Sequence, residues 1–116
     1  MANANTDRSN LQHFTLYLAN RRIYARNPDG HLVDLGGLRQ EDGRFGYVLD
    51  GDKSGADGLD GEDAVLRRLE DELTFVFLDG QFTSLPDVSD QVDVEGAPQR
   101  RIALEEFVED GDDPAA

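Results

Sequence analysis

The acidic segment between positions 50 and 62 contains the side chains best suited to bind a metal ion. Asp50, Asp52 and Ser54 alternate along the chain and are followed by a glycine, which is the spacing that begins an EF-hand calcium loop. In such a loop, alternate side-chain oxygens converge on the ion while the glycine makes a sharp turn. With further oxygen ligands nearby, the candidate calcium ligands are Asp50, Asp52, Ser54, Asp57, Asp60 and Glu62.

Two positions of this loop depart from the EF-hand pattern. The twelfth position, where a bidentate glutamate belongs, is Gly61, and the usually apolar eighth position is Asp57. Glu62 or Asp63 would have to supply the missing ligand. Because Asp and Gly are frequent in the whole chain, the competing interpretation is a solvated acidic loop. Calcium is the one cofactor that the sequence suggests, and no other is expected.

Arginines form three doublets in a chain whose single lysine is Lys53. Arginine binds carboxylates and phosphates in a bidentate manner, so the doublets mark candidate contact surfaces. Nucleic acid is not an expected partner, because its affinity rests on neutralising phosphates and this chain has a net charge of −14. We favour ion pairs within or between subunits. The candidate interface residues are Arg21, Arg22, Tyr24, Arg26, Arg100 and Arg101.

No catalytic constellation stands out in the sequence. Cysteine is absent, which removes thiolate catalysis and cysteine-based zinc sites. The two histidines, His13 and His31, have no serine nucleophile beside them in a recognisable motif. Close pairs of carboxylates carry no specificity in a chain with 25 acidic residues. We therefore expect a protein that is not an enzyme.

The acidic charge is the strongest compositional signal. Acidic residues number 25 and basic residues 11, whereas a small domain usually keeps its net charge to a magnitude of about 2–8. Adaptation to very high salt would explain this, because screening makes self-repulsion weak there. The composition resembles that of proteins from haloarchaea, which accumulate salt inside the cell. The charge is also uneven: residues 1–40 hold five arginines and three aspartates, a net of +2, which leaves −16 for the remainder.

The hydropathy pattern predicts an α+β fold that is mainly β. Six or seven short, largely antiparallel strands would form a sheet, a sandwich or a small open barrel, with one amphipathic helix at about 62–73. A polar N-terminal arm would occupy residues 1–12, a single β-rich domain residues 13–108, and an acidic tail residues 109–116. Eight stretches are candidates for these six or seven strands: 13–19, 22–26, 31–35, 45–49, 74–78, 81–85, 91–95 and 99–104. Residues 99–109 also fit a helical stripe, but we favour a strand to Leu104 with a short helical turn after it.

The helix prediction rests on an apolar stripe at spacings of three and four, formed by Val65, Leu66, Leu69 and Leu73, with Asp60 as its N-cap. The continuous apolar run of residues 74–78 favours a buried central strand. Asp79-Gly80 is typical of a tight hairpin turn, which would pair that strand with residues 81–85. The polar stretches at 36–43 and 50–61 are expected to be loops.

These features together favour a non-enzymatic assembly or interaction protein. One concrete form is a structural subunit of a virus particle from a halophilic host, as a head decoration, head–tail connector or tail component. The alternatives are a small acidic regulator or inhibitor that mimics nucleic acid, and a calcium-stabilised binding module. The expected partners are proteins, either copies of the chain itself or other assembly subunits.

The first ten residues are polar and lack the apolar core of a signal peptide. No apolar run reaches the length that a membrane span needs. We expect the chain to stay in the cytoplasm or to enter a virion, and not to be secreted through a signal peptide.

Overall fold

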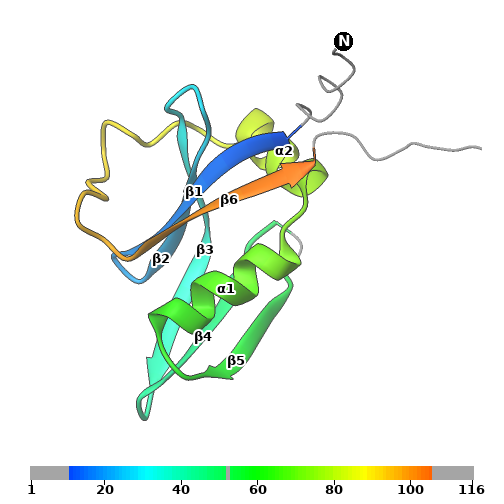
Figure 1. Cartoon of the computed structure of the whole chain (residues 1–116). Helices are drawn as coiled ribbons and strands as arrows, with labels where there is room; N and C mark the ends of the chain where they lie inside the picture. Colours follow the sequence, from blue (N-terminus) through cyan, green and yellow to red (C-terminus); the bar gives the residue numbers. More distant parts are fainter. Residues whose placement is uncertain (1–10, 52, 106–116) are drawn as a thin grey trace, which may run out of the picture.

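The computed structural model describes residues 11–51 and 53–105, and Figure 1 shows how their elements are arranged. The fold is α+β and mainly β, as the sequence predicts: six antiparallel strands form a curled half-barrel sheet, and two helices pack on it. The elements are β1 (Leu11–Ala19), β2 (Arg22–Arg26), β3 (Leu32–Glu41), β4 (Arg44–Leu49), β5 (Gly55–Leu59), α1 (Glu62–Glu72), α2 (Phe75–Ser84) and β6 (Gln99–Glu105).

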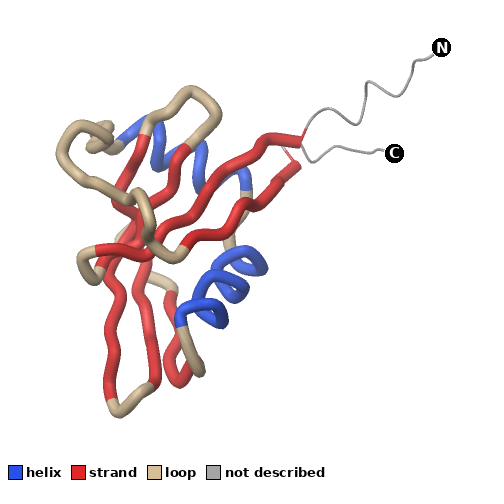
Figure 2. The backbone as a smooth tube through the Cα atoms, turned by 60° about the vertical axis from the view of Figure 1, so that its left-hand side comes forward, coloured by secondary structure: helices blue, strands red, loops and turns tan. Residues whose placement is uncertain are grey.

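The strands run through the sheet in the order β5-β4-β3-β2-β1-β6. Hairpin turns join β1 to β2 at Asn20-Arg21 and β2 to β3 at residues 27–30, both of which the turn residues predict. The last strand returns to pair with the first, so Leu11 lies opposite Glu105. Figure 2 shows β1 and β6 side by side along their length. The two edges of the sheet are therefore β5 and β6.

One face of the curled sheet packs against both helices and forms the main core. Alternate residues of β1, such as Phe14, Leu16 and Leu18, point to this face, as the period-2 pattern predicts. α1 contributes Val65, Leu66 and Leu69 in the predicted stripe. The remaining core residues are Ile23, Ala25, Val33, Leu35, Tyr47, Leu49, Leu73, Leu78 and Ile102.

A second, smaller core lies on the opposite face. Tyr17, Tyr24 and Leu32 project from β1, β2 and β3 and pack against Val94 of the segment between α2 and β6. The backbone N–H of Val88 donates to the carbonyl oxygen of Leu32 at 2.8 Å, which fixes the start of that segment on β3. The sheet is thus covered on both faces, although only one face carries helices.

Helix α1 is held on the sheet by a polar contact as well as by its apolar stripe. The Tyr47 hydroxyl donates a hydrogen bond to the Glu72 carboxylate. Burial of the ring, together with that carboxylate, raises the pKa of Tyr47. Within the helix, Arg67 pairs with Asp63 at 3.0 Å, as their spacing predicts. The N-cap prediction is wrong: Gly61 caps α1 in an extended conformation, without a side-chain hydrogen bond.

The largest correction to the sequence prediction concerns residues 74–85. The expected strand at 74–78 and its hairpin partner at 81–85 are a single helix, α2. The Thr74 side chain accepts a hydrogen bond from the Phe77 N–H, which caps the helix. Leu78 is fully buried, and Phe75 and Phe82 pack against the ring of Phe14. Apolar residues at spacings of three and four therefore outweigh the local β propensity of this run.

Other segments also differ from the prediction. The expected loop at 36–43 is largely strand, because β3 continues to Glu41 and pairs with β4. The expected loop at 50–61 contains β5, a strand with two glycines that pairs through its backbone. The expected strand at 91–95 is irregular. β1 begins at Leu11, so the last two residues of the predicted N-terminal arm belong to the sheet. The predicted acidic tail and the helical turn after β6 lie outside the described residues.

Gly80 tests the helical assignment of α2 directly. In a helix, replacing an interior glycine by alanine stabilises the fold by about 0.5–1 kcal/mol, because the unfolded chain loses freedom. A Cβ added at Gly80 would meet no atom within 4 Å. We expect Gly80→Ala to raise the melting temperature. In the hairpin turn that Asp79-Gly80 suggests, the glycine would need a positive φ and the same change would lower it.

Candidate functional site

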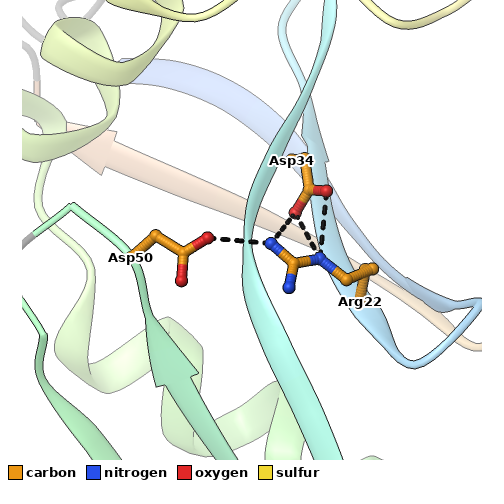
Figure 3. Close-up of polar contacts among 3 residues, drawn as sticks. All are labelled: Arg22, Asp34 and Asp50. Atoms are coloured by element: carbon orange, nitrogen blue, oxygen red, sulfur yellow. Dashed lines mark hydrogen bonds and ion pairs between the residues drawn. The ribbon is translucent and has the colours of Figure 1, made fainter.

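Two sets of candidate residues meet in one partly exposed ion-pair cluster. Arg22 on β2 donates from Nε to both carboxylate oxygens of Asp34 at 3.0 Å. The Nη2 atom of Arg22 donates to the Oδ2 of Asp50, the residue after β4, at 2.8 Å (Figure 3). The Asp34 carboxylate is the main cause that raises the pKa of Arg22. A candidate interface arginine and a candidate calcium ligand therefore satisfy each other.

The other candidate calcium ligands are spread apart. Asp57 lies on β5 and pairs with Arg39, and Asp60 lies 3.9 Å from Arg44. Glu62 begins α1 and borders a cleft that it shares with residues of β3 and the β1–β2 turn. Among the described residues, no group of three or more acidic or histidine side chains is placed to hold a metal. Asp52 lies outside those residues, so calcium binding stays a prediction.

The remaining candidate interface residues occupy different environments. Tyr24 is only 4% exposed and belongs to the second core, which leaves it almost no surface for a partner. Arg26 lies over the Tyr17 ring and donates to its hydroxyl at 3.2 Å. Arg100 pairs with Glu70 of α1 at 2.7 Å. Arg21 is exposed in the β1–β2 turn, and Arg101 is exposed on the edge strand β6.

A cleft with a volume of about 690 Å³ lies beside the second core. Tyr17 and Arg26 form one wall, and the segment of residues 89–96 forms the other. Its acids, such as Asp90 and Asp93, face the single arginine. With three acids against one arginine, the lining carries a net negative charge and disfavours an anionic ligand.

Asp87 fastens the segment that builds this cleft. Its Oδ1 accepts hydrogen bonds from the backbone N–H of Leu32 at 3.0 Å and of Ser89 at 2.9 Å. These bonds, with the Leu32 N–H as the largest cause, lower the pKa of Asp87 to about 2. The carboxylate therefore joins β3 to the start of the covering segment while it is ionised.

The lowered pKa predicts how pH acts on this attachment. A depressed pKa in the folded state stabilises the fold above the ordinary value of 3.8, and the contribution is lost as the pH falls towards 2. Asp87→Asn keeps an acceptor oxygen but removes the charge. We expect the melting temperature of the parent to exceed that of the variant at neutral pH and to approach it over this window. Two parallel curves between pH 2 and pH 6 would contradict the assignment.

A groove of about 290 Å³ lies where the end of β6 meets the start of β1 and the junction of the two helices. Most of the side chains that line it are apolar. We call it the β6 groove, and its residues are Leu11, Leu73, Thr74, Phe75, Val76, Ala103, Leu104 and Glu105.

Exposed apolar surface is concentrated in the β6 groove. In the described part of the chain, the only large apolar side chains that are exposed are Leu11, at 44%, and Val76, at 71%. Leu11 lies at the start of β1 and Val76 lies on α2, and both line the groove. Single exposed apolar residues are ordinary, but their convergence on one groove is typical of an interaction surface.

Within residues 11–51 and 53–105, no strand pairs with the outer side of β6, the edge strand beside this groove. Leu18 donates to the carbonyl oxygen of Pro98, so this opposite pair is a hydrogen-bonded one. Such pairs alternate along an antiparallel ladder, and β6 pairs with β1 without a register shift. The N–H and C=O groups of Arg101, Ala103 and Glu105 therefore point away from β1. They form a free edge of the kind that pairs with other strands.

Comparison with protein-family models, with curated proteins and with solved structures finds no match to this chain. Over residues 11–51 and 53–105, no helix is long and apolar enough to cross a membrane.

The sequence predicts only part of this surface. Arg101 is a candidate interface residue because it belongs to a doublet. Val76 is not, because it lies inside an apolar run that indicates a buried strand. The helical spacing of Phe75, Leu78 and Phe82 after a capping threonine is the signal that would have placed Val76 on the outer side of a helix.

Proposed function

We propose that this chain is a non-enzymatic assembly protein that binds copies of itself or other assembly subunits through the β6 groove and the edge of β6. One observation carries the proposal: Leu11 and Val76, the exposed large apolar side chains of the described residues, converge beside an unpaired strand edge. Apolar surface gives affinity to such a contact, and backbone pairing gives it direction.

The narrower form of the proposal is a structural subunit of a virus particle from a halophilic host. It is supported by the composition of the chain, with its net charge of −14 and a single lysine. Two copies of so acidic a protein repel each other in dilute salt. Screening shortens the range of that repulsion to about 3 Å in 1 M salt, which favours association there.

The solution mass tests this function. Light scattering would be measured in about 0.1 M and about 1 M salt, each with and without calcium. We expect a multimer in high salt. Val76→Asp, which places a charge in the β6 groove, should shift the mass towards the monomer. Thr83→Asp is the matched control, because Thr83 is exposed on the same helix outside the groove. A monomer under every condition would contradict self-assembly.

A further inference from the structure

Resting on the proposed function, we infer that two copies of the chain pair through β6, antiparallel and in a single register with a two-fold axis at Ala103. The partner is thus a second copy of this chain, and the contact continues the sheet across the axis from the β6 edge of one copy to that of the other.

The phase of the β1–β6 ladder limits the registers that are open to such a pair. Outward backbone groups belong to Arg101, Ala103 and Glu105, so these residues must lie opposite one another across the axis. A two-fold axis at Ala103 places Ala103 opposite its own copy and Arg101 opposite Glu105. All outward groups of the three residues then find partners.

Charge selects this register among those that the ladder allows. An axis at Arg101 would place two arginines opposite each other, and an axis at Glu105 would do the same with two carboxylates. The phase also allows axes at Ile102 and Leu104, but these place neither Arg101 nor Glu105 opposite a residue of the opposite charge. The axis at Ala103 instead creates two Arg101–Glu105 pairs, one on each side of the axis. Both residues are exposed, and neither forms an ion pair within the described part of the chain. Opposite charges in facing positions stabilise strand pairs.

Apolar residues are also matched in this register. Ile102 and Leu104 would face each other as non-hydrogen-bonded pairs, whose side chains lie closer together. Ile102 is buried in the main core, and Leu104 is half-buried beside it. The β6 groove begins at the axis, since Ala103 and Leu104 line it. The dimer would therefore extend the main core across the junction.

The other edge of the sheet is a poor alternative. β5 contains Gly58 with a φ of 71°, and its ladder with β4 shifts register between Phe45 and Tyr47. Irregular edges of this kind protect sheets from pairing. β6, in contrast, has seven residues, contains no proline and pairs with β1 regularly. A further strand can therefore pair with β6 more readily than with β5.

A charge exchange tests the register. Arg101→Glu would place glutamates opposite each other at two sites, and Glu105→Arg would do the same with arginines. We expect about tenfold weaker self-association for either variant alone, from light scattering over a concentration series. An equimolar mixture of the two variants restores both ion pairs and should associate as the parent does. Arg44→Glu, at the far end of the β3–β4 hairpin, is the control for net charge.

A backbone variant tests the strand pairing independently. Ala103→Pro removes an N–H that points outward, so the ladder with β1 keeps its hydrogen bonds. We expect a folded monomer by circular dichroism and light scattering. If the parent forms multimers but Arg101→Glu and Ala103→Pro associate as strongly as Arg44→Glu, the β6 pairing is wrong, and the proposed function is left with self-association through the β6 groove alone. If the parent is a monomer in all salt conditions, both the β6 pairing and self-assembly are contradicted.

Discussion

Leu78→Ala should lower the free energy of unfolding by about 2–5 kcal/mol, the cost of removing a leucine side chain from a packed core. Leu78 is 0% exposed and packs in the main core from the middle of α2. Urea unfolding followed by circular dichroism measures the change. The effect is large because α2 holds one end of the half-barrel with few buried residues, and Leu78 is its only fully buried one among those described.

Val76→Ala is the matched control, because Val76 lies two residues away on the same helix and is 71% exposed. We expect this change to stay within about 0.5 kcal/mol, as at most surface positions. In a continuous central strand at residues 74–78, Val76 and Leu78 would point to the same face, and both side chains would be buried. Comparable losses from the two variants would therefore overturn the helical assignment.

The elements that the sequence predicts correctly are those whose side chains carry a periodic signal. β1 alternates apolar and polar residues, and α1 shows a stripe from Val65 to Leu73, so either pattern identifies its element without tertiary information. β5 has no such signal. Its residues, Gly55 to Leu59, form a strand because their backbone groups pair with those of β4. The position of β4 depends in turn on the rest of the fold.

The helix α2 shows how two local signals compete. The run from Thr74 to Leu78 is rich in β-forming residues, and Asp79-Gly80 is typical of a hairpin turn. As a helix, the same residues bury Leu78 and bring Phe75 and Phe82 against Phe14. The tertiary contacts decide, and they are not visible in a window of ten residues.

The candidate site was predictable only in part for the same reason. The sequence identifies Asp50 and Arg22 as chemically capable residues but not as partners, since they are 28 residues apart in the chain. Their pairing makes the cluster a structural one, although surface ion pairs contribute only about 0–1 kcal/mol each. The β6 groove depends on Leu11 and Val76 meeting at one end of the sheet, which only the fold establishes.

Folding brings the basic and acidic parts of the sequence together. Arginines of the first 40 residues pair with acids of the remainder, as Arg22 does with Asp50 and Arg39 with Asp57. The fold thus satisfies part of the basic charge that the sequence leaves concentrated at one end. Arg101 keeps an exposed charge beside a free strand edge, which is why it carries the proposed contact.

The close approach of β3 and β4 predicts the second large effect, for Gly36→Ala. A Cβ at Gly36 would clash with the Val48 carbonyl oxygen and lie 2.9 Å from the Leu49 Cα, and neither backbone atom can move aside freely. We expect a loss of about 1–3 kcal/mol in the free energy of unfolding, as for other overpacked sites. The glycine is required here by space, since its φ is not positive.

Gly37→Ala provides the comparison in the same strand. A Cβ at Gly37 would meet only the tip of the flexible Arg22 side chain, at 3.4 Å. Because glycine weakens a strand by about 0.5–1 kcal/mol relative to alanine, this variant should be neutral or slightly more stable in urea. Equal losses at both positions would show that β3 tolerates no side chain in this region, and the specific contact with Val48 would then not be the cause. β3 can approach the Val48 carbonyl oxygen this closely because Gly36 carries no side chain, whereas the backbone around Gly37 leaves room for one.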